Sequence, residues 1–422
     1  MLDLKLIRSD PDLVRAGLER RGAAGDLDRV IELDGRRREI LPELETVRGA
    51  RREASERIGE AKREGREAEA EMAEVREMKG RIEELEGELA SVEETLDGLV
   101  AALPNLPDPG APDGSEEEDA VVLREVGELP EFDFEPRDHV ELAGDRIDLE
   151  QAAKASGARF AYLKGDLVML EMALVRWVLG VLSGEGYEPV VPPILVREEA
   201  LFGTGFLPGD RDQIYEVEKD SLFLAGTAEV PLASLGADLI FEPDRLPARF
   251  AGFSPCFRRE AGAAGRDTHG IFRVHQFDKV EMFSFVTPEE SEAEHQRILG
   301  IEERILGELG LPYRVVDIAA GDLGAPAARK FDCEAWIPSQ DRYREVTSCS
   351  NTTDFQARRL SSRFRPAAEA KPELVHTLNG TAIAVGRTII ALLENGQRPD
   401  GSVGLPEVLG EFGAPAELKP GP

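Results

Sequence analysis

The sequence predicts an α+β protein in which a long antiparallel α-helical hairpin precedes a larger domain, built on an antiparallel β-sheet flanked by helices. Three observations support this prediction. A heptad pattern extends over residues 27–103, a segment dense in Pro, Gly and acidic residues occupies 104–119, and strand-like and helix-like runs follow it. A chain of 422 residues usually forms two or three domains.

The first 103 residues predict helices. The run Ser9-Asp10-Pro11-Asp12 indicates a helix start, with Pro11 in the first turn. From residue 27, apolar residues recur at steps of four and three on two halves, which predicts two helices packed along one seam. Gly65 can form the turn between them, and Pro42 should kink the first helix or delay its start. The predicted seam consists of Ile40, Leu44, Val47, Arg51, Ala54, Ile58 and Ala61, and on the return of Met72, Val75, Ile82, Leu85, Leu89, Val92, Leu96, Leu99 and Leu103.

Charge is distributed unevenly over this hairpin. Residues 36–66 hold ten Arg and Lys against seven Glu, whereas residues 67–103 hold three basic residues against twelve acidic ones. A basic stripe can bind an RNA backbone, or its members can pair with Glu residues on the facing helix, and the pattern alone leaves both alternatives open. The stripe consists of Arg48, Arg51, Arg52, Arg57, Lys62, Arg63 and Arg66.

The run PNLPDPGAPDGSEEED at 104–119 predicts a linker. We therefore expect an N-terminal domain of residues 1–110 and a second domain of residues 111–422. Within the second, GYEPVVPPILV at 186–196 is an apolar run broken by prolines and predicts an edge strand.

Two strand-like runs within residues 253–285 predict a long β-hairpin. They are FSPCF and IFRVHQFDKVEMFSF, with a loop rich in Gly and Ala between them. Arg258, Glu260 and Arg273 interleave with aromatic residues, so one face can be a polar platform. Such a platform suits a planar base on Phe277 and phosphate oxygens on Arg258, because arginine binds phosphate in a bidentate way. The alternative is a solvated edge hairpin with ordinary surface charges.

Composition narrows the class of protein. The net charge of −32 argues against a nonspecific nucleic-acid binder, so an RNA partner would need a local basic face. No stretch approaches the ~20 uninterrupted apolar residues of a membrane span, and the N-terminus lacks an apolar signal core, so we expect a cytoplasmic protein without a membrane partner. The spacing of Cys256, Cys333 and Cys349 fits neither a disulfide framework nor a zinc site. The sequence contains no Walker-type GxxxxGK and no strand-linked GxGxxG; if the chain binds ATP, the nucleotide therefore binds to an Arg/Glu platform on a sheet.

Four runs carry a resemblance to a known family. FRREAGAAGRDTHGIFRVHQFDKVEMF at 257–283 resembles motif 2 of class II aminoacyl-tRNA synthetases, and in detail that of the bacterial-type seryl-tRNA synthetase family. The other runs agree in order and spacing: TAEVPL at 227–232, EVTSCSNTTDFQARR at 345–359, and HTLNGTAIAVGRTIIALLENGQ at 376–397. The resemblance covers nearly the whole chain. It implies a class II catalytic domain that activates L-serine with ATP and transfers it to tRNA(Ser), and also to tRNA(Sec) where that tRNA exists.

The resemblance implies roles at ATP for several residues. Arg258 would hold the α-phosphate and the substrate carboxylate, and Glu260 the adenine amino group. Phe277 would lie under the adenine, and Arg387 on its other face, near the γ-phosphate. The complete set expected around ATP is Arg258, Glu260, Arg273, Val274, Phe277, Glu345, Val346, Thr347, Ser348 and Arg387.

Magnesium is the expected cofactor beside ATP. Adenylate formation brings one anion to another, so catalysis consists mostly of charge neutralisation and alignment. The resemblance implies that Glu345 and Ser348 bind Mg²⁺ and phosphate, which fits a cation that usually takes one or two carboxylates plus phosphate oxygens. Arg258, Glu345 and Arg387 are the expected catalytic residues.

The resemblance also implies a serine pocket. Thr227 and Glu229 would receive the ammonium group. Glu281 and Thr381 would meet the hydroxyl, with Thr381 following an expected Asn-Gly turn, and Asn379 would line the pocket. The helical hairpin would bind the long variable arm of serine tRNA, and residues 186–196 would form a homodimer interface.

Two departures and two alternatives accompany the resemblance. Arg259 stands where the family usually has serine, which adds a charge beside Arg258, and Gly226 replaces a common proline. One alternative is a ligase that loads a small amino acid on a carrier protein, but such relatives lack the long arm and use a zinc-bound pocket. The other is a catalytically inactive paralogue, although the expected catalytic residues are all present.

Overall fold

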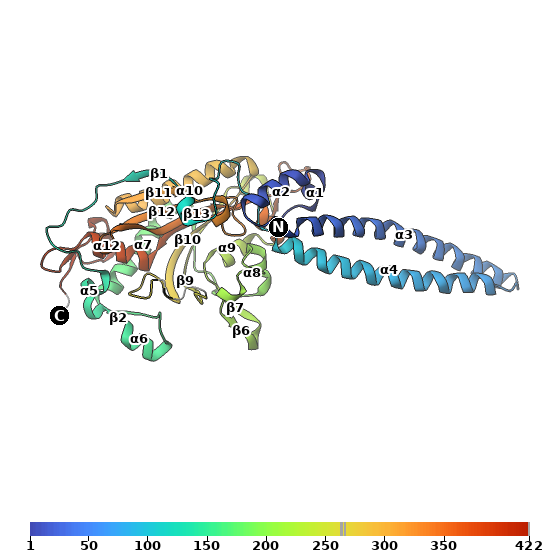
Figure 1. Cartoon of the computed structure of the whole chain (residues 1–422), viewed down its shortest axis with the longest axis horizontal. Coiled ribbons are helices and arrows are strands. Elements are labelled where there is room, and N and C mark those ends of the chain that lie inside the picture. Colours follow the sequence, from blue (N-terminus) through green and yellow to red (C-terminus); the bar gives the residue numbers. More distant parts are fainter. Residues whose placement is uncertain (262–264, 266, 421–422) are drawn as a thin grey trace. The chain divides into compact units, whose positions relative to one another are not determined.

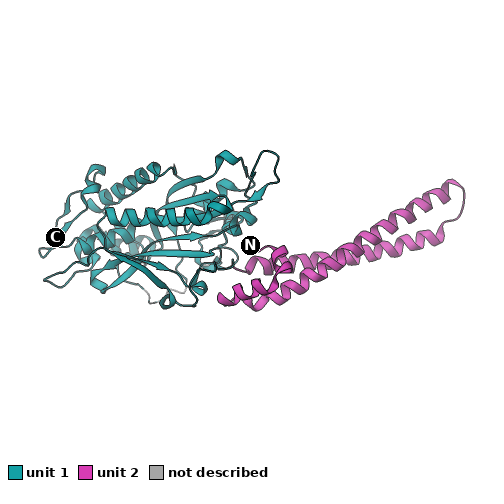
Figure 2. Ribbon diagram, turned by 90° about the horizontal axis from the view of Figure 1, so that it is seen from above, with its two compact units in different colours: residues 1, 105–422 teal, residues 2–104 magenta. Residues whose placement is uncertain are grey.

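The computed structural model describes residues 1–261, 265 and 267–420. Residues 262–264 and 266, in the loop of the expected β-hairpin, and residues 421–422 lie outside the described part. The chain divides into two compact units, one of Leu2–Pro104 and one of Met1 with Asn105–Pro422 (Figure 2). The division therefore falls between Pro104 and Asn105, a few residues before the expected boundary at residue 110.

The smaller unit is helical, as predicted. Asp10 caps its second helix, because its carboxylate accepts a hydrogen bond from the Leu13 N–H at 3.1 Å. The two long helices run antiparallel and join through a loop in which Gly65 has a φ of +70°, a backbone conformation that favours glycine (Figure 1). The helices are α1 (Leu4–Ser9), α2 (Pro11–Arg20), α3 (Leu27–Arg63) and α4 (Glu69–Ala102), with a 3₁₀ turn at Ala24–Asp26.

The seam between α3 and α4 follows the predicted heptads with two corrections. Ile40 and Leu85 are fully buried, and most of the predicted members are buried or half-buried. Arg51 and Met72 are instead exposed. A guanidinium cannot enter an apolar seam without a partner, and Met72 lies in the first turn of α4, beside the loop. Pro42 lies inside the continuous helix α3, so the expectation of a delayed start was wrong.

The larger unit is built on an eight-stranded sheet (Figure 1). All neighbouring strands pair antiparallel except the edge pair β4–β9, which is parallel. In spatial order the strands are β1 (Val121–Val126), β11 (Tyr313–Asp317), β12 (Arg329–Ile337), β13 (Arg342–Asn351), β16 (His376–Ala384), β10 (Gln276–Val286), β9 (Ala248–Phe257) and β4 (Glu188–Val190).

Three long helices cover this sheet: α7 (Asp166–Gly184), α10 (Ser291–Glu308) and α12 (Val385–Asn395). Shorter elements complete the unit: helices α5 (His139–Ala143), α6 (Leu149–Ser156), α8 (Glu198–Thr204), α9 (Glu229–Ala233) and α11 (Phe355–Leu360), and strands β2 (Ile147–Asp148), β3 (Tyr162–Leu163), β5 (Leu195–Val196), β6 (Glu216–Val217), β7 (Leu222–Leu224), β8 (Ile240–Phe241), β14 (Arg363–Phe364), β15 (Glu373–Leu374), β17 (Val403–Gly404) and β18 (Glu417–Leu418).

Helix α7 is rich in apolar residues, although Asp166, Glu171 and Arg176 interrupt the run. By length and composition it could cross a membrane, and it is the one such helix among the described residues. Leu170, Leu174, Trp177 and Val178 lie on one face of the helix and are buried in the main core. We therefore interpret α7 as a core helix of the sheet domain.

The predicted β-hairpin is present as strands β9 and β10, with Gln276 opposite Phe257. Its second strand begins at Gln276 and not at Ile271, so Arg258, Glu260 and Arg273 lie in the connecting loop. The expected Asn-Gly turn before Thr381 is also wrong, because that dipeptide lies inside β16. A Cβ at Gly380 would come within 2.4 Å of Ile298 on α10, so glycine is required there by close packing.

Candidate active site

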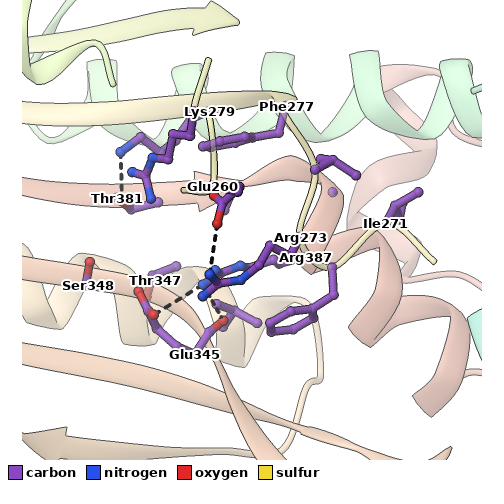
Figure 3. A pocket seen from close by; sticks show the side chains of 16 residues that line it. Glu260, Ile271, Arg273, Phe277, Lys279, Glu345, Thr347, Ser348, Thr381 and Arg387 are labelled. Carbon is purple, nitrogen blue, oxygen red and sulfur yellow. Dashed lines mark hydrogen bonds and ion pairs between the residues drawn. The ribbon is translucent and has the colours of Figure 1, made fainter. Parts of the chain in front are cut away.

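A cavity of about 110 Å³ opens on one face of the sheet. Its walls come from the β9–β10 loop, from β10 and β13, and from the start of α12 (Figure 3). Strand periodicity explains this convergence, since Phe277, Lys279 and Glu281 project to this face while Asp278 reaches Glu171 of α7 on the other. All ten residues predicted to surround ATP line this one cavity: Arg258, Glu260, Arg273, Val274, Phe277, Glu345, Val346, Thr347, Ser348 and Arg387.

Two Arg–Glu pairs lie in the cavity. An Arg387 Nη lies 3.3 Å from a carboxylate oxygen of Glu345 and donates to the Glu345 carbonyl at 2.9 Å. Arg273 donates to Glu260 at 2.8 Å (Figure 3). Glu260 has a φ of 51°, in the left-handed region that few non-glycine residues adopt, which is typical of functional positions held by their surroundings.

Glu345 is held in its ionised form. Burial disfavours the charged carboxylate, but the cations Lys330, Arg387 and Arg258 outweigh it and lower the pKa of Glu345 to about 2. Lys330 was not predicted from the sequence. It lies on the neighbouring strand β12, two residues before Asp332, and its ammonium group is 2.8 Å from that carboxylate.

Two arginines lie over aromatic rings in the cavity. The Arg258 guanidinium is 5.3 Å from the ring centroid of Phe277, and the Arg387 guanidinium is 4.8 Å from that of Phe272. Phe277 therefore faces Arg258 in this structure, whereas Arg387 faces Phe272. The expected placement of adenine between Phe277 and Arg387 stays a prediction.

A buried polar cluster adjoins the cavity. It contains the five residues that were expected at serine but not at ATP. The Thr381 hydroxyl donates to Glu281 at 3.3 Å. The Asn379 amide contacts Glu281 at 3.2 Å and Glu229 at 3.4 Å, and the Glu229 N–H donates to the Thr227 hydroxyl at 3.2 Å. The structure thus brings together residues from β10, β16 and the start of α9.

Glu229 has unusual electrostatics. It is 7% exposed, and burial, followed by the neighbouring carboxylate of Glu281, raises its pKa from 4.5 to about 7. A hydrogen bond from Gln356 at 2.7 Å only partly offsets this effect. The buried Gln356 is itself oriented by the Thr377 hydroxyl, which donates to it at 2.8 Å.

Sequence reasoning missed Gln356 and Lys279. The period of two along β10 could have found Lys279, because it lies between Phe277 and Glu281 on the same face. No local pattern identifies Gln356, which reaches the cluster only through the packing of α11. Arg259, whose added charge was a concern, is exposed, and its guanidinium lies 5.9 Å from the ring centroid of Tyr215.

The basic stripe of the helical unit shows in part the interhelical pairing that was one of its two alternatives. Three of its members form ion pairs, namely Arg48 with Glu86 at 2.8 Å, Arg57 with Glu74 at 3.2 Å, and Arg66 with Glu64 at 2.6 Å. All seven members are exposed, and four of them form no ion pair within the described helical unit: Arg51, Arg52, Lys62 and Arg63. Arg48 and Arg57 therefore link α3 to α4 through ion pairs, whereas Arg66 pairs within the connecting loop.

The three cysteines are buried and free of disulfides. Among the described residues, no group of three or more His, Cys, Asp or Glu side chains is placed to hold a metal ion. A cation at Glu345 and Ser348 would thus need further oxygen ligands from a bound molecule.

Comparisons with known proteins match both units of the chain. Residues 1–107 match the model of the seryl-tRNA synthetase N-terminal domain, and residues 214–396 match the model of the class II tRNA synthetase core domain for G, H, P, S and T. The serine--tRNA ligase of Rubrobacter xylanophilus is 50% identical over 97% of both chains, and that of Nocardia farcinica is 47% identical over the full length of both.

A solved structure agrees with these matches. The seryl-tRNA synthetase of Pyrococcus horikoshii, complexed with ATP, superposes with a TM-score of 0.94 at 42% identity and covers all of both chains. The chain belongs to the seryl-tRNA synthetase family of class II aminoacyl-tRNA synthetases.

Proposed function

We propose that this chain activates L-serine with ATP and transfers the seryl group to tRNA(Ser), with release of pyrophosphate and AMP. The observation that carries the proposal is the junction of two groups of residues. A cavity with paired Arg and Glu side chains adjoins a buried cluster whose two carboxylates suit a small amino acid. Full-length relatives named serine--tRNA ligase support this function and not the carrier-protein alternative.

In the first step, a carboxylate oxygen of serine attacks the α-phosphorus of ATP, and pyrophosphate leaves. Arg258 would bind both the serine carboxylate and the α-phosphate, which brings two anions together. Arg387 would bind the γ-phosphate, and its contact with Glu345 fixes its orientation. Such fixed donors lower the barrier because they require no reorganisation as charge develops. In the second step, the terminal ribose hydroxyl of tRNA attacks the seryl carbonyl and AMP leaves.

Mg²⁺ is the proposed cofactor, and the chain offers suitable ligands. Glu345 carries a full charge at neutral pH, and both Glu345 and Ser348 line the cavity. When bound, the ion would neutralise part of the phosphate charge. The adenine would stack on Phe277, and Glu260, with its pairing to Arg273, would accept a hydrogen bond from the adenine amino group.

Serine would lie against the buried cluster. Its ammonium group would meet Thr227 and Glu229, and its hydroxyl would meet Glu281 and Thr381. Alanine would leave the buried Glu281 without this hydrogen bond, and pockets of this kind can reject such an analogue by about 10⁴-fold or more. Threonine keeps the hydroxyl, so only steric exclusion of its methyl group can act against it.

The domain of residues 1–110 is the proposed tRNA-binding domain, and residues 111–422 form the proposed catalytic domain. The basic stripe would contact the backbone of the long variable arm of tRNA(Ser), or of tRNA(Sec) where it exists, above all through the members that form no ion pair within the described helical unit. Those residues are Arg51, Arg52, Lys62 and Arg63.

A homodimer through the catalytic domain is also proposed. Helix α7 carries an exposed apolar face of Val168, Met169 and Met172, opposite its buried face. Strand β4 is at the edge of the main sheet, and the adjacent Val191 is 83% exposed. A contiguous apolar surface beside a sheet edge is typical of a protein interface. The free, buried cysteines fit a reducing compartment such as the cytoplasm.

Two assays test the proposed function. Serine-dependent exchange of pyrophosphate into ATP measures the first step, and charging of tRNA(Ser) measures the second. We expect both activities with serine and Mg²⁺. Absence of exchange would identify an inactive paralogue, and exchange without tRNA charging would point to a different acceptor.

A further inference from the structure

Lys279 is a buried cation at the boundary between the ATP cavity and the serine cluster. It lines the cavity, yet it is only 6% exposed. Its ammonium group lies 2.5 Å from a Glu281 carboxylate oxygen. It also lies 3.4 Å from the Thr381 hydroxyl (Figure 3). These two partners are the residues proposed to meet the serine hydroxyl. Lys279 therefore contacts the end of the pocket that reads the substrate side chain.

The charges of the pocket divide into two groups. Glu229 receives hydrogen bonds from the neutral amides of Gln356 and Asn379, and no described Lys or Arg forms an ion pair with its carboxylate. Glu281 is in direct contact with Lys279. Serine brings a single ammonium group, which the Glu229 end can neutralise. The charge of Glu281 is already balanced by the protein.

We propose that Lys279 determines side-chain specificity: by neutralising Glu281, it makes that end of the pocket accept a hydroxyl group and refuse a second ammonium group. This inference rests on the proposed serine activation. The excluded class consists of short amino acids with a cationic side chain. The diagnostic member is L-2,3-diaminopropionate, which has an amino group where serine has its hydroxyl. In the wild-type pocket this group would face Lys279 at close range, and like charges in a buried site repel strongly.

A purely structural role for Lys279 makes a different prediction. If the lysine only stabilises β10, its loss should lower stability and slow activation of every amino acid by a similar factor. A lost contact with ATP would also affect all amino acids alike. The ratio between two amino acids is therefore the informative measurement, because it changes only if Lys279 acts on the side chain.

The experiment compares wild-type protein with Lys279→Met in pyrophosphate exchange, using serine and 2,3-diaminopropionate. We expect the wild type to prefer serine by about 10²-fold or more. In Lys279→Met, the unpaired Glu281 carboxylate can bind the second ammonium group, so the preference should move toward the diamine by about 10²-fold, even if both rates fall. Lys164→Met, which removes an exposed lysine paired with Asp148, is the matched control and should keep the wild-type ratio.

The double variant Lys279→Met/Glu281→Gln tests the role of the carboxylate. It lacks both charges and should lose the gain for the diamine. An unchanged ratio in Lys279→Met, or a gain that persists in the double variant, overturns the proposal. If Lys279→Met does not fold, pyrophosphate exchange by the wild type still tests the proposal. Activation of 2,3-diaminopropionate as readily as serine would overturn it. Failure of the wild type to activate serine would instead refute the proposed function.

Discussion

Glu229→Gln should stabilise the catalytic unit at alkaline pH while it abolishes most serine activation. The buried carboxylate has a pKa raised from 4.5 to about 7, whereas an unfolded chain would give it an ordinary value. The folded state therefore holds a proton that the unfolded state has lost between these two pH values. Folding stability falls as pH rises through this window and stays lower above it. The glutamine amide has the same shape and does not titrate.

The magnitude follows from the pKa shift. At 1.36 kcal/mol per unit, ionised Glu229 costs about 3 kcal/mol of stability above pH 7. Between pH 5.5 and pH 8.5, the stability of Glu229→Gln relative to wild type should rise by about 2 kcal/mol. For a unit of this size that corresponds to a change in relative Tm of about 3 °C. Any pH-independent effect of the substitution cancels in this comparison.

The assay is thermal unfolding followed by tryptophan fluorescence. Both tryptophans, Trp177 and Trp336, belong to the catalytic unit, so the signal does not report the helical unit. Glu131→Gln, which replaces an exposed carboxylate of the same unit, is the matched control and should give an offset that does not change with pH. A difference between Glu229→Gln and wild type that is equal at both pH values would refute the reasoning.

The other predictions concern separate parts of the molecule. Arg258→Ala and Arg387→Ala should each slow adenylate formation by about 10²-fold, the scale for loss of one charge-stabilising donor, and normal pyrophosphate exchange would exclude the residue from the site. Glu281→Ala should narrow the gap between serine and alanine in the same assay, and an unchanged ratio would mean that another group reads the hydroxyl. Deletion of residues 30–100 should preserve serine activation and sharply reduce tRNA charging, while equal charging would rule out the hairpin as the RNA-binding element. Met172→Glu should convert a dimer into monomers in light scattering, because it places a charge in the proposed apolar interface, and a persistent dimer would locate the interface elsewhere.

Features set by local sequence could be predicted well. Heptad spacing identified the two long helices, and Gly65 identified the loop between them, because both signals act over a few residues. The errors in the seam, at Arg51 and Met72, came from treating the heptad as uniform. The heptad pattern alone does not predict that the Arg51 side chain turns to solvent. Nor does it predict that Met72, in the first turn of α4, is exposed beside the loop.

The convergence of side chains could be predicted where they belong to continuous motifs, since the ten residues expected at ATP line one cavity; their roles stay predictions. Lys330 lies outside these motifs and reaches Glu345 only from the neighbouring strand. Gln356 lies within the run at 345–359, but nothing in that run marks it as a partner of Glu229, which it reaches through the packing of α11. The Asn-Gly dipeptide at 379–380 shows the converse limitation. Its glycine is needed beneath α10, not in a turn, and a single sequence cannot distinguish the two causes.

The ion pairs across the helical hairpin have a consequence for how the arm can change. Arg48 and Arg57 are committed to Glu86 and Glu74, so replacing them alters the contact between the helices. Arg51, Arg52, Lys62 and Arg63 form no ion pair within the described arm. A change among them would alter what the arm can bind and leave the pairing of its helices intact. The affinity of the arm for an RNA and the stability of the α3–α4 contact can therefore vary independently. Substitutions among the unpaired basic residues could change the binding partner without changing how the two helices pack.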